Sequence, residues 1–187
     1  VWCVAPIGSP GFFQTGDDMI AAMKCHDVRA VRIVPGGFPM HPEVMGSTLE
    51  FLEAQQVLTI LEVGSARYPS GWGTPDVFSF FHDFLSRHPD LPVLLTGHMW
   101  DQQWAIYRLM ELHKNLHIEF SNFQINRGIE YYVSTFGDDR LLFGSGMTEK
   151  SPGAARAFVD YAQISEESKR KIAGVNLKRL LGGQGPR

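Results

Sequence analysis

The sequence predicts an α/β protein with a parallel sheet. Short apolar segments recur six times along the 187 residues, with starts near residues 2, 29, 57, 92, 116 and 140. A stretch of helical periodicity follows each segment, and the repeat of roughly 24 to 35 residues has the length of a βα unit. Glycine, proline or another turn residue bounds the apolar runs, as is typical of strands that are covered on both faces.

Each expected strand is an apolar run that stops at a turn. The second and third runs are rich in β-branched residues, which strands favour, and the third is apolar except for Thr59 and Glu62. The last run, Leu141–Phe143, stops abruptly at a Gly-Ser-Gly turn. The expected strands are Trp2–Ala5, Val28–Val34, Val57–Val63, Pro92–His98, Leu116–Ser121 and Leu141–Phe143.

The expected helices follow from caps, end charges and apolar spacing. Ser151 and Pro152 form an N-cap and a first-turn proline. The last helix has Glu166 and Glu167 in its first turn and basic residues in its last, which matches the helix dipole at both ends. The expected helices are Asp17–His26, Gly46–Gln55, Pro75–Arg87, Asp101–Met110, Ile129–Phe136, Pro152–Tyr161 and Ser165–Leu181.

Two α/β architectures accommodate six such units in a single domain over residues 1–187. A barrel of eight units takes about 250 residues, so six units here have the length per unit of a barrel that lacks two. Val1 already stands inside an apolar strand, and we expect this chain to be a fragment. If two units precede Val1, the fold is a (β/α)8 TIM barrel. If none does, the alternative is a six-stranded doubly wound parallel sheet, although Ile7–Gly11 does not form the glycine-rich phosphate fingerprint.

Composition narrows the class of partner. The formal net charge of −3 offers no basic excess to neutralise phosphates, so we expect no nucleic-acid partner. No apolar run approaches the length of a membrane span, and we expect no membrane partner. Cys3 and Cys25 form no CxxC pair and fit a reducing compartment, which predicts a cytoplasmic protein. Open edges on a six-stranded fragment predict a homo-oligomer.

Polar residues at strand ends mark the candidate site. His98 ends the fourth strand, where parallel α/β folds place their chemistry, although a buried, hydrogen-bonded histidine is the alternative. Arg32 lies within an apolar strand and needs either a carboxylate partner or an anionic substrate, because an unpaired buried charge is costly. Glu62 on the next strand is the expected partner, and it can also pair with Arg67. Trp100 and Arg67 follow strand ends, and together with Arg32 we expect them to bind substrate.

Four segments resemble the amidohydrolase-related (amidohydrolase 2) family of TIM-barrel metal-dependent hydrolases and decarboxylases. Phe136–Ser145 resembles the strand-eight motif of that family, and Ile172–Gly182 its closing helix. Leu94–His98 is similar to its strand six, and Ala30–Pro35 to its strand four. The resemblance implies that the six strands are strands three to eight of a (β/α)8 barrel and that the chain is a divergent member.

The resemblance also implies a divalent metal such as zinc, bound by histidines of strands one, five and six and by an aspartate after strand eight. In this chain His98 matches the strand-six ligand, Glu62 stands at the strand-five position, and Gly146 replaces the aspartate. His98 and Glu62 are the metal ligands if a metal is bound. Because only one of the three positions matches, we expect no tightly bound transition metal. Glu149, three residues after Gly146, can either reach back toward the site or remain a solvated loop charge.

Two functional hypotheses remain. The first is an amidohydrolase-related hydrolase or decarboxylase that acts on a small carboxylated or cyclic substrate at the rim formed by the carboxyl ends of the strands. In it His98 and Glu62 are catalytic. The second is a metal-free barrel that has lost catalysis and acts as a binding protein, which the glycine at position 146 favours.

Overall fold

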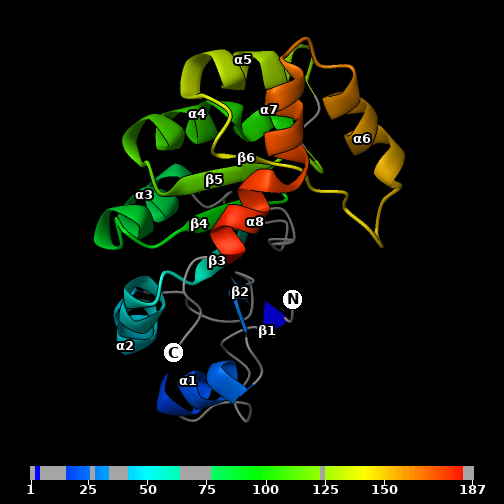
Figure 1. Ribbon diagram of the computed structural model, residues 1–187. Coiled ribbons are helices and arrows are strands. Elements are labelled where there is room, and N and C mark those ends of the chain that lie inside the picture. Colours follow the sequence, from blue (N-terminus) through cyan, green and yellow to red (C-terminus); the bar gives the residue numbers. More distant parts are fainter. Residues whose placement is uncertain are drawn as a thin grey trace.

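A computed structural model describes residues 3–4, 16–25, 28–33, 42–63, 77–122 and 125–182 (Figure 1). Its strands are β1 (Cys3–Val4), β2 (Ala30–Ile33), β3 (Leu58–Glu62), β4 (Val93–Thr96), β5 (Leu116–Glu119) and β6 (Leu141–Leu142). Its helical segments are α1 (Gly16–Cys25), α2 (Pro42–Ala54), α3 (Val77–Arg87), η1 (Trp100–Gln102), α4 (Gln103–Leu112), α5 (Gly128–Phe136), α6 (Pro152–Asp160), α7 (Glu166–Arg170), η2 (Lys171–Val175) and α8 (Asn176–Leu181).

The strands form one parallel sheet in the order β1-β2-β3-β4-β5-β6. Each strand pairs with the next along the chain, and residues such as Ala30 and Leu58 are register partners. A doubly wound sheet reverses its strand order at a switch point, whereas a barrel adds strands in sequence. The sequential order therefore agrees with the expected barrel type and excludes the doubly wound alternative.

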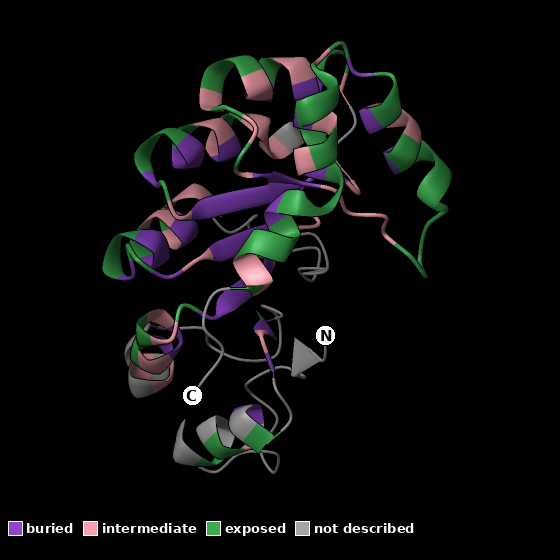
Figure 2. Cartoon of the chain, in the orientation of Figure 1, coloured by how far each residue is buried: buried purple, intermediate pink, exposed green. Residues whose placement is uncertain are grey.

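Alternation along the strands separates two apolar clusters. Val31, Leu61, Leu95 and Ile118 belong to the larger cluster, which the helices that follow the strands complete. The other face carries Ala30, Leu58, Leu94 and Leu142, and Leu180 and Leu181 of α8 pack on that cluster. Figure 2 shows β4 and β5 as buried. The second face is the one that a barrel turns inward, and we call it the inner face.

The C-terminal helix is broken, contrary to the single helix expected over Ser165–Leu181. Ser165 is the N-cap of α7, since its side chain accepts a hydrogen bond from the Ser168 N–H. A π-helical turn, η2, then separates α7 from α8. The break frees the Ile172 carbonyl, which accepts a hydrogen bond from the Phe143 N–H at 2.8 Å. The regular α-helical hydrogen-bond pattern is thus interrupted where the helix contacts the residue after β6.

The start of α6 agrees with the expectation, whereas the start of α2 differs from it. The Ser151 side chain accepts from the Gly153 N–H, and Pro152 occupies the first turn of α6. Helix α2 begins at Pro42, earlier than the expected Gly46. Among the described residues, none of the helices has the length and apolar character that a membrane crossing requires.

Candidate active site

A cavity of about 450 Å³ opens on the inner face at the carboxyl ends of the strands. Its polar lining includes Arg32, Glu62, Thr96, Glu119, Asn122 and Lys150. These side chains come from β2, β3, β4, the end of β5, and the segments after β5 and β6. Two hollows of about 530 and 630 Å³ lie among α5, α6 and the residues that follow α6, and no strand end contributes to them.

Arg32 and Glu62 form an ion pair across the cavity wall. The Arg32 Nη2 donates to Glu62 Oε2, which confirms the pairing expected from the sequence. Arg32 is the register partner of Ile60, so Glu62 stands two residues further along the neighbouring strand, on the same face. The Arg32 side chain is 51% exposed and that of Glu62 15%. Both residues line the cavity, and the arginine side chain is the more exposed of the two.

Glu119 places a second, deeper carboxylate at the cavity. This residue ends β5 and is buried. Its Oε1 accepts from the Gly97 N–H at 3.0 Å and from the Ser121 hydroxyl at 2.8 Å, and its Oε2 accepts from the Ser121 N–H at 2.6 Å. Charge-assisted hydrogen bonds of this kind compensate a buried carboxylate. Glu119 thereby ties the segment after β4 to the segment after β5.

The Glu119 side chain also explains a glycine in the strand-eight motif. A Cβ on Gly144 would lie 1.7 Å from Glu119 Oε2. No real Cβ tolerates such a distance, so position 144 must be glycine as long as Glu119 keeps its place. One carboxylate therefore contacts three segments that follow β4, β5 and β6, all of which line the cavity.

His98 lies outside the cavity lining. It is fully buried, and burial lowers the pKa of its imidazole from 6.5 to about 4, so the ring is neutral at neutral pH. Strict alternation after Thr96 would turn His98 toward the inner face. Gly97, however, has φ +72° and interrupts that alternation. The structure thus brings Arg32 and Glu62 together but does not bring His98 to the cavity beside them.

The other candidate residues have different positions. Trp100 lies in η1, is 62% exposed and is not among the residues that line the cavity. Arg67 lies outside the described residues. Gly146 and Glu149 both line the cavity, and Glu149 is exposed.

Lys150 occupies the space beside Gly146 where a side chain would stand. Gly146 has φ +67°, a conformation that glycine adopts without strain. A Cβ there would lie 3.3 Å from the Lys150 Cβ and Cδ, and the Lys150 N–H donates to the Gly146 carbonyl at 2.9 Å. This chain therefore packs the stem of a lysine where the resembling family has a carboxylate.

The donor set at the cavity does not fit the metal that the resemblance implies. Glu62 is engaged by Arg32, and both oxygens of Glu119 accept hydrogen bonds from neutral donors. His98 is absent from the lining. Among the described residues, no three His, Cys, Asp or Glu side chains gather closely enough to hold an ion. Zinc sites need at least three such ligands, so we assign no chemistry through a metal.

Sequence reasoning missed Glu119 and Asn122. Glu119 carries a usable signal, because it is an acidic residue near the carboxyl end of an expected strand, as Glu62 is. Asn122 carries none, since an asparagine after a strand is a common turn residue. Its place at the cavity depends on its Nδ2, which donates to the Gly97 carbonyl at 3.2 Å.

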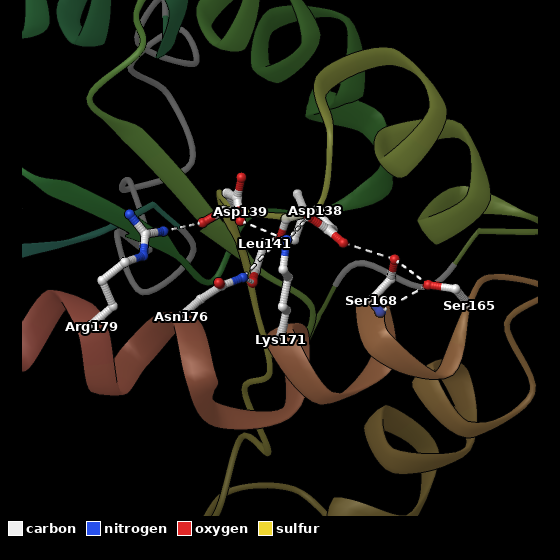
Figure 3. A network of polar contacts seen from close by, with 8 residues as sticks. All are labelled: Asp138, Asp139, Leu141, Ser165, Ser168, Lys171, Asn176 and Arg179. Carbon is white, nitrogen blue, oxygen red and sulfur yellow. Dashed lines mark hydrogen bonds and ion pairs between the residues drawn. The ribbon is translucent and has the colours of Figure 1, made fainter.

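A polar network fastens the C-terminal helices to β6 (Figure 3). The buried Asn176 donates through Nδ2 to the carbonyls of Asp138 and Leu141, at 2.7 and 2.9 Å. Lys171 Nζ pairs with Asp138 and Asp139, at 2.9 and 3.0 Å. Ser168 donates to Asp138 Oδ2 at 2.8 Å. These contacts hold the C-terminal helices to the turn before β6 and to its first residue, Leu141.

Comparison with profiles of known families gives no match, and neither does comparison with curated protein sequences. Solved structures do match. An uncharacterised TIM-barrel protein from Bordetella bronchiseptica aligns with a TM-score of 0.67 and 22% identity, over 92% of this chain and 65% of that one.

Two structures with named activities align in a similar way. The 5-carboxyvanillate decarboxylase LigW from Sphingomonas paucimobilis has a TM-score of 0.67 and 15% identity, over 90% of this chain and 64% of that one. A putative amidohydrolase from Staphylococcus aureus aligns with a TM-score of 0.66 and 17% identity, over 89% of this chain and 68% of that one. The chain spans about two thirds of the length of these proteins. It therefore has the fold of a large part of a TIM barrel, in the architecture that amidohydrolases and decarboxylases share.

Proposed function

We propose that this chain forms most of the barrel of an amidohydrolase-related enzyme, a hydrolase or decarboxylase, that acts on a small carboxylated substrate. The observation that carries the proposal is the Arg32–Glu62 ion pair inside a cavity at the carboxyl ends of parallel strands. Cavities in this position bind substrates in barrel enzymes. The resemblance at four segments and the shared fold with a named decarboxylase add support.

Arg32 is suited to hold a carboxylate. A guanidinium has five N–H donors in a planar fork. Among the described residues, Arg32 has one partner, Glu62, which it contacts through Nη2. Its other N–H groups, which have no partner among the described residues, could form a two-pronged contact with a substrate carboxylate, and Glu62 would fix the direction of the fork.

Glu62 also sets the charge of the site. Because Glu62 neutralises the charge of Arg32, an incoming carboxylate binds Arg32 through hydrogen bonds to its other N–H groups and gains little from net charge attraction. Lys150, which lines the same cavity, supplies a second cation. A carboxylate that lies between the two cations gains from both.

A second function, binding without catalysis, is supported by the glycine at position 146 and by the engaged carboxylates of Glu62 and Glu119. A barrel that lacks the strand-eight carboxylate, with Glu62 and Glu119 both engaged, is suited to binding a small acid without converting it. This alternative shares the ligand class of the enzyme and differs only in turnover.

An assay of turnover and binding distinguishes these functions. The purified protein is incubated with 2,6-dihydroxybenzoate and 5-carboxyvanillate, as decarboxylase probes, and with small cyclic amides that carry a carboxylate, as hydrolase probes. Products are followed by chromatography, and binding by calorimetry. The enzyme proposal expects product from at least one probe. Binding without product supports the binding protein, and neither binding nor product contradicts both.

The Arg32→Gln variant and a matched control connect the result to the site. Losing a hydrogen-bonded charge contact lowers affinity by about 10- to 100-fold. Arg108→Gln removes an arginine that is paired with Glu111 on the surface of α4 and is similarly exposed, at 59%. The control should keep the wild-type affinity and rate.

A further inference from the structure

A groove lies between helix α5 and the segment 157–168, which runs from α6 into α7 (Figure 1). Two hollows of about 530 and 630 Å³ form it, and they adjoin because Arg127, Glu130 and Gln163 line both. Apolar and aromatic side chains line each hollow as well: Ile125, Phe158 and Tyr161 the first, and Tyr131, Val133 and Ile164 the second. We call this surface the α5 groove. It shares no described lining residue with the cavity at the strand ends.

Arg127 stands where the two hollows meet. This exposed residue has no side-chain partner among the described residues. Glu130 lies three residues further along, at a spacing that allows an ion pair on a helix. Its Oε1 instead accepts a hydrogen bond from the Gln163 N–H at 2.9 Å. The groove therefore holds a cation that the nearest acidic residue on the same helix does not neutralise by direct contact.

The rim of the groove consists of residue types that dominate contacts between proteins. Besides Arg127, it carries Tyr161 and Tyr131, which are 86% and 48% exposed. The Tyr131 ring lies 4.8 Å from that of Tyr107, which in turn meets the exposed Trp104 edge to face at 6.3 Å. Tyrosine, tryptophan and arginine are the residues that most often contribute the binding energy of an interface. A small-molecule site encloses most of its ligand. A groove with so exposed a rim fits a segment of a larger partner better.

The charge of the groove selects the partner. A purely apolar segment would remove Arg127 from water without giving it a partner, which is costly. One aspartate or glutamate supplies that partner through a charge-assisted hydrogen bond. A second acidic residue would face Glu130 and be repelled. The complementary segment thus has a single carboxylate and apolar side chains for the two hollows.

We infer that the α5 groove binds a peptide segment of a partner protein in which one acidic residue is flanked by apolar residues. The acidic side chain pairs with Arg127, and the apolar side chains enter the hollows on either side of it. This inference is independent of the proposed function, because the groove and the cavity at the strand ends have separate linings.

Matched peptides test the inference. The probes are acetylated and amidated heptapeptides with aspartate or glutamate at the centre. Leucine or phenylalanine stands one, two or three residues away on both sides, and glycine and serine fill the other positions. Each acidic peptide is compared with its counterpart that has asparagine or glutamine at the centre. Dissociation constants are measured by calorimetry or ligand-observed NMR.

In the wild type, at least one acidic peptide should bind about 10-fold more tightly than its amide counterpart, the value of one charge-assisted hydrogen bond. Arg127→Gln should bring that ratio close to one. Arg170→Gln removes an exposed arginine of α7 that lines neither hollow, and it should keep the wild-type ratio. Tyr161→Ala should weaken both members of a pair by the same factor and leave their ratio unchanged.

The inference is overturned if no acidic peptide is preferred over its amide counterpart, or if the preference survives in Arg127→Gln. A preference that Arg170→Gln also abolishes would mean that general charge attraction causes it, and would overturn the inference as well. Sedimentation tests the other occupant, a second copy of this chain. If the wild type is a dimer that Arg127→Glu dissociates, the groove is an interface between copies, and the peptide partner is ruled out.

Discussion

The carboxylate of Glu119 occupies the space that a side chain on Gly144 would need. Glu119 ends β5 and Gly144 follows the neighbouring strand β6, and an added Cβ at 144 would lie 1.7 Å from Glu119 Oε2. The glycine of the strand-eight motif thus has a physical reason in this chain, and the reason is a residue on another strand. The pair links the shape of the cavity to the packing of the sheet.

Gly144→Ala should therefore destabilise the protein by about 1–3 kcal/mol, the usual cost of overpacking a filled site. The displaced carboxylate would also lose its contacts with Gly97 and Ser121. Urea unfolding gives the change. In a Glu119→Ser background, where the space is vacated, the same substitution should cost less.

A control for the comparison of Gly144→Ala in the two backgrounds is Gly46→Ala in helix α2, where an added Cβ meets nothing within 4 Å. Alanine favours a helix over glycine by about 1 kcal/mol, so this variant should gain stability. Equal costs of Gly144→Ala in the two backgrounds would show that Glu119 is not the obstacle.

Asn176→Ala should weaken the attachment of the C-terminal helices. The Asn176 amide is buried and satisfies the carbonyls of Asp138 and Leu141. Leaving two buried acceptors unpaired costs about 2–4 kcal/mol, which thermal or urea unfolding detects. The exposed Asn126→Ala, by comparison, should stay within about 0.5 kcal/mol of the wild type. A change as small for Asn176 would mean that the contacts in Figure 3 contribute little.

The stability of the protein should fall as the pH drops from 6.5 toward 4. His117 is buried, and the pKa of its imidazole is lowered from 6.5 to about 4, chiefly because burial removes the charged form from water. The unfolded chain binds this proton at the higher pH and the folded chain only at the lower one, so protonation favours unfolding within that window. At pH 4, one such histidine has lowered the free energy of unfolding by about 3 kcal/mol.

The free energy of unfolding, measured at several pH values, tests this. His117→Gln should make the pH dependence shallower between pH 6.5 and 4. An unchanged slope in the variant would mean that His117 does not titrate as its burial requires.

Elemental analysis of the purified protein should find far less than one zinc or manganese per chain. Glu62 is paired with Arg32, Glu119 is engaged by three donors, and Lys150 stands beside the glycine that replaces the family's aspartate. A content of about one transition metal per chain would contradict this reading of the donor set.

The sequence predicts the strands and the ion pair because both depend on local pattern. Apolar runs mark β2 to β6, and a charge inside such a run, as at Arg32, requires a partner on the neighbouring strand. Glu62 was the expected partner and is the observed one.

The remaining features of the site depend on backbone angles and on contacts between loops. The position of His98 follows from the left-handed turn at Gly97, which pattern alone does not reveal. Glu119 becomes part of the site only through Gly97, Ser121 and Gly144, which come from three separate segments. The break at η2 likewise coincides with a contact between segments, the hydrogen bond from the Phe143 N–H to the Ile172 carbonyl.

The affinity of the wild type and of Arg32→Gln for benzoate and for the uncharged benzamide tests the central claim most directly. If the cavity binds a carboxylate through Arg32, the wild type should prefer benzoate by about 10-fold or more, and Arg32→Gln should abolish that preference, while Arg108→Gln keeps it. Equal binding of benzoate and benzamide by the wild type, or a preference that persists without Arg32, would contradict the account.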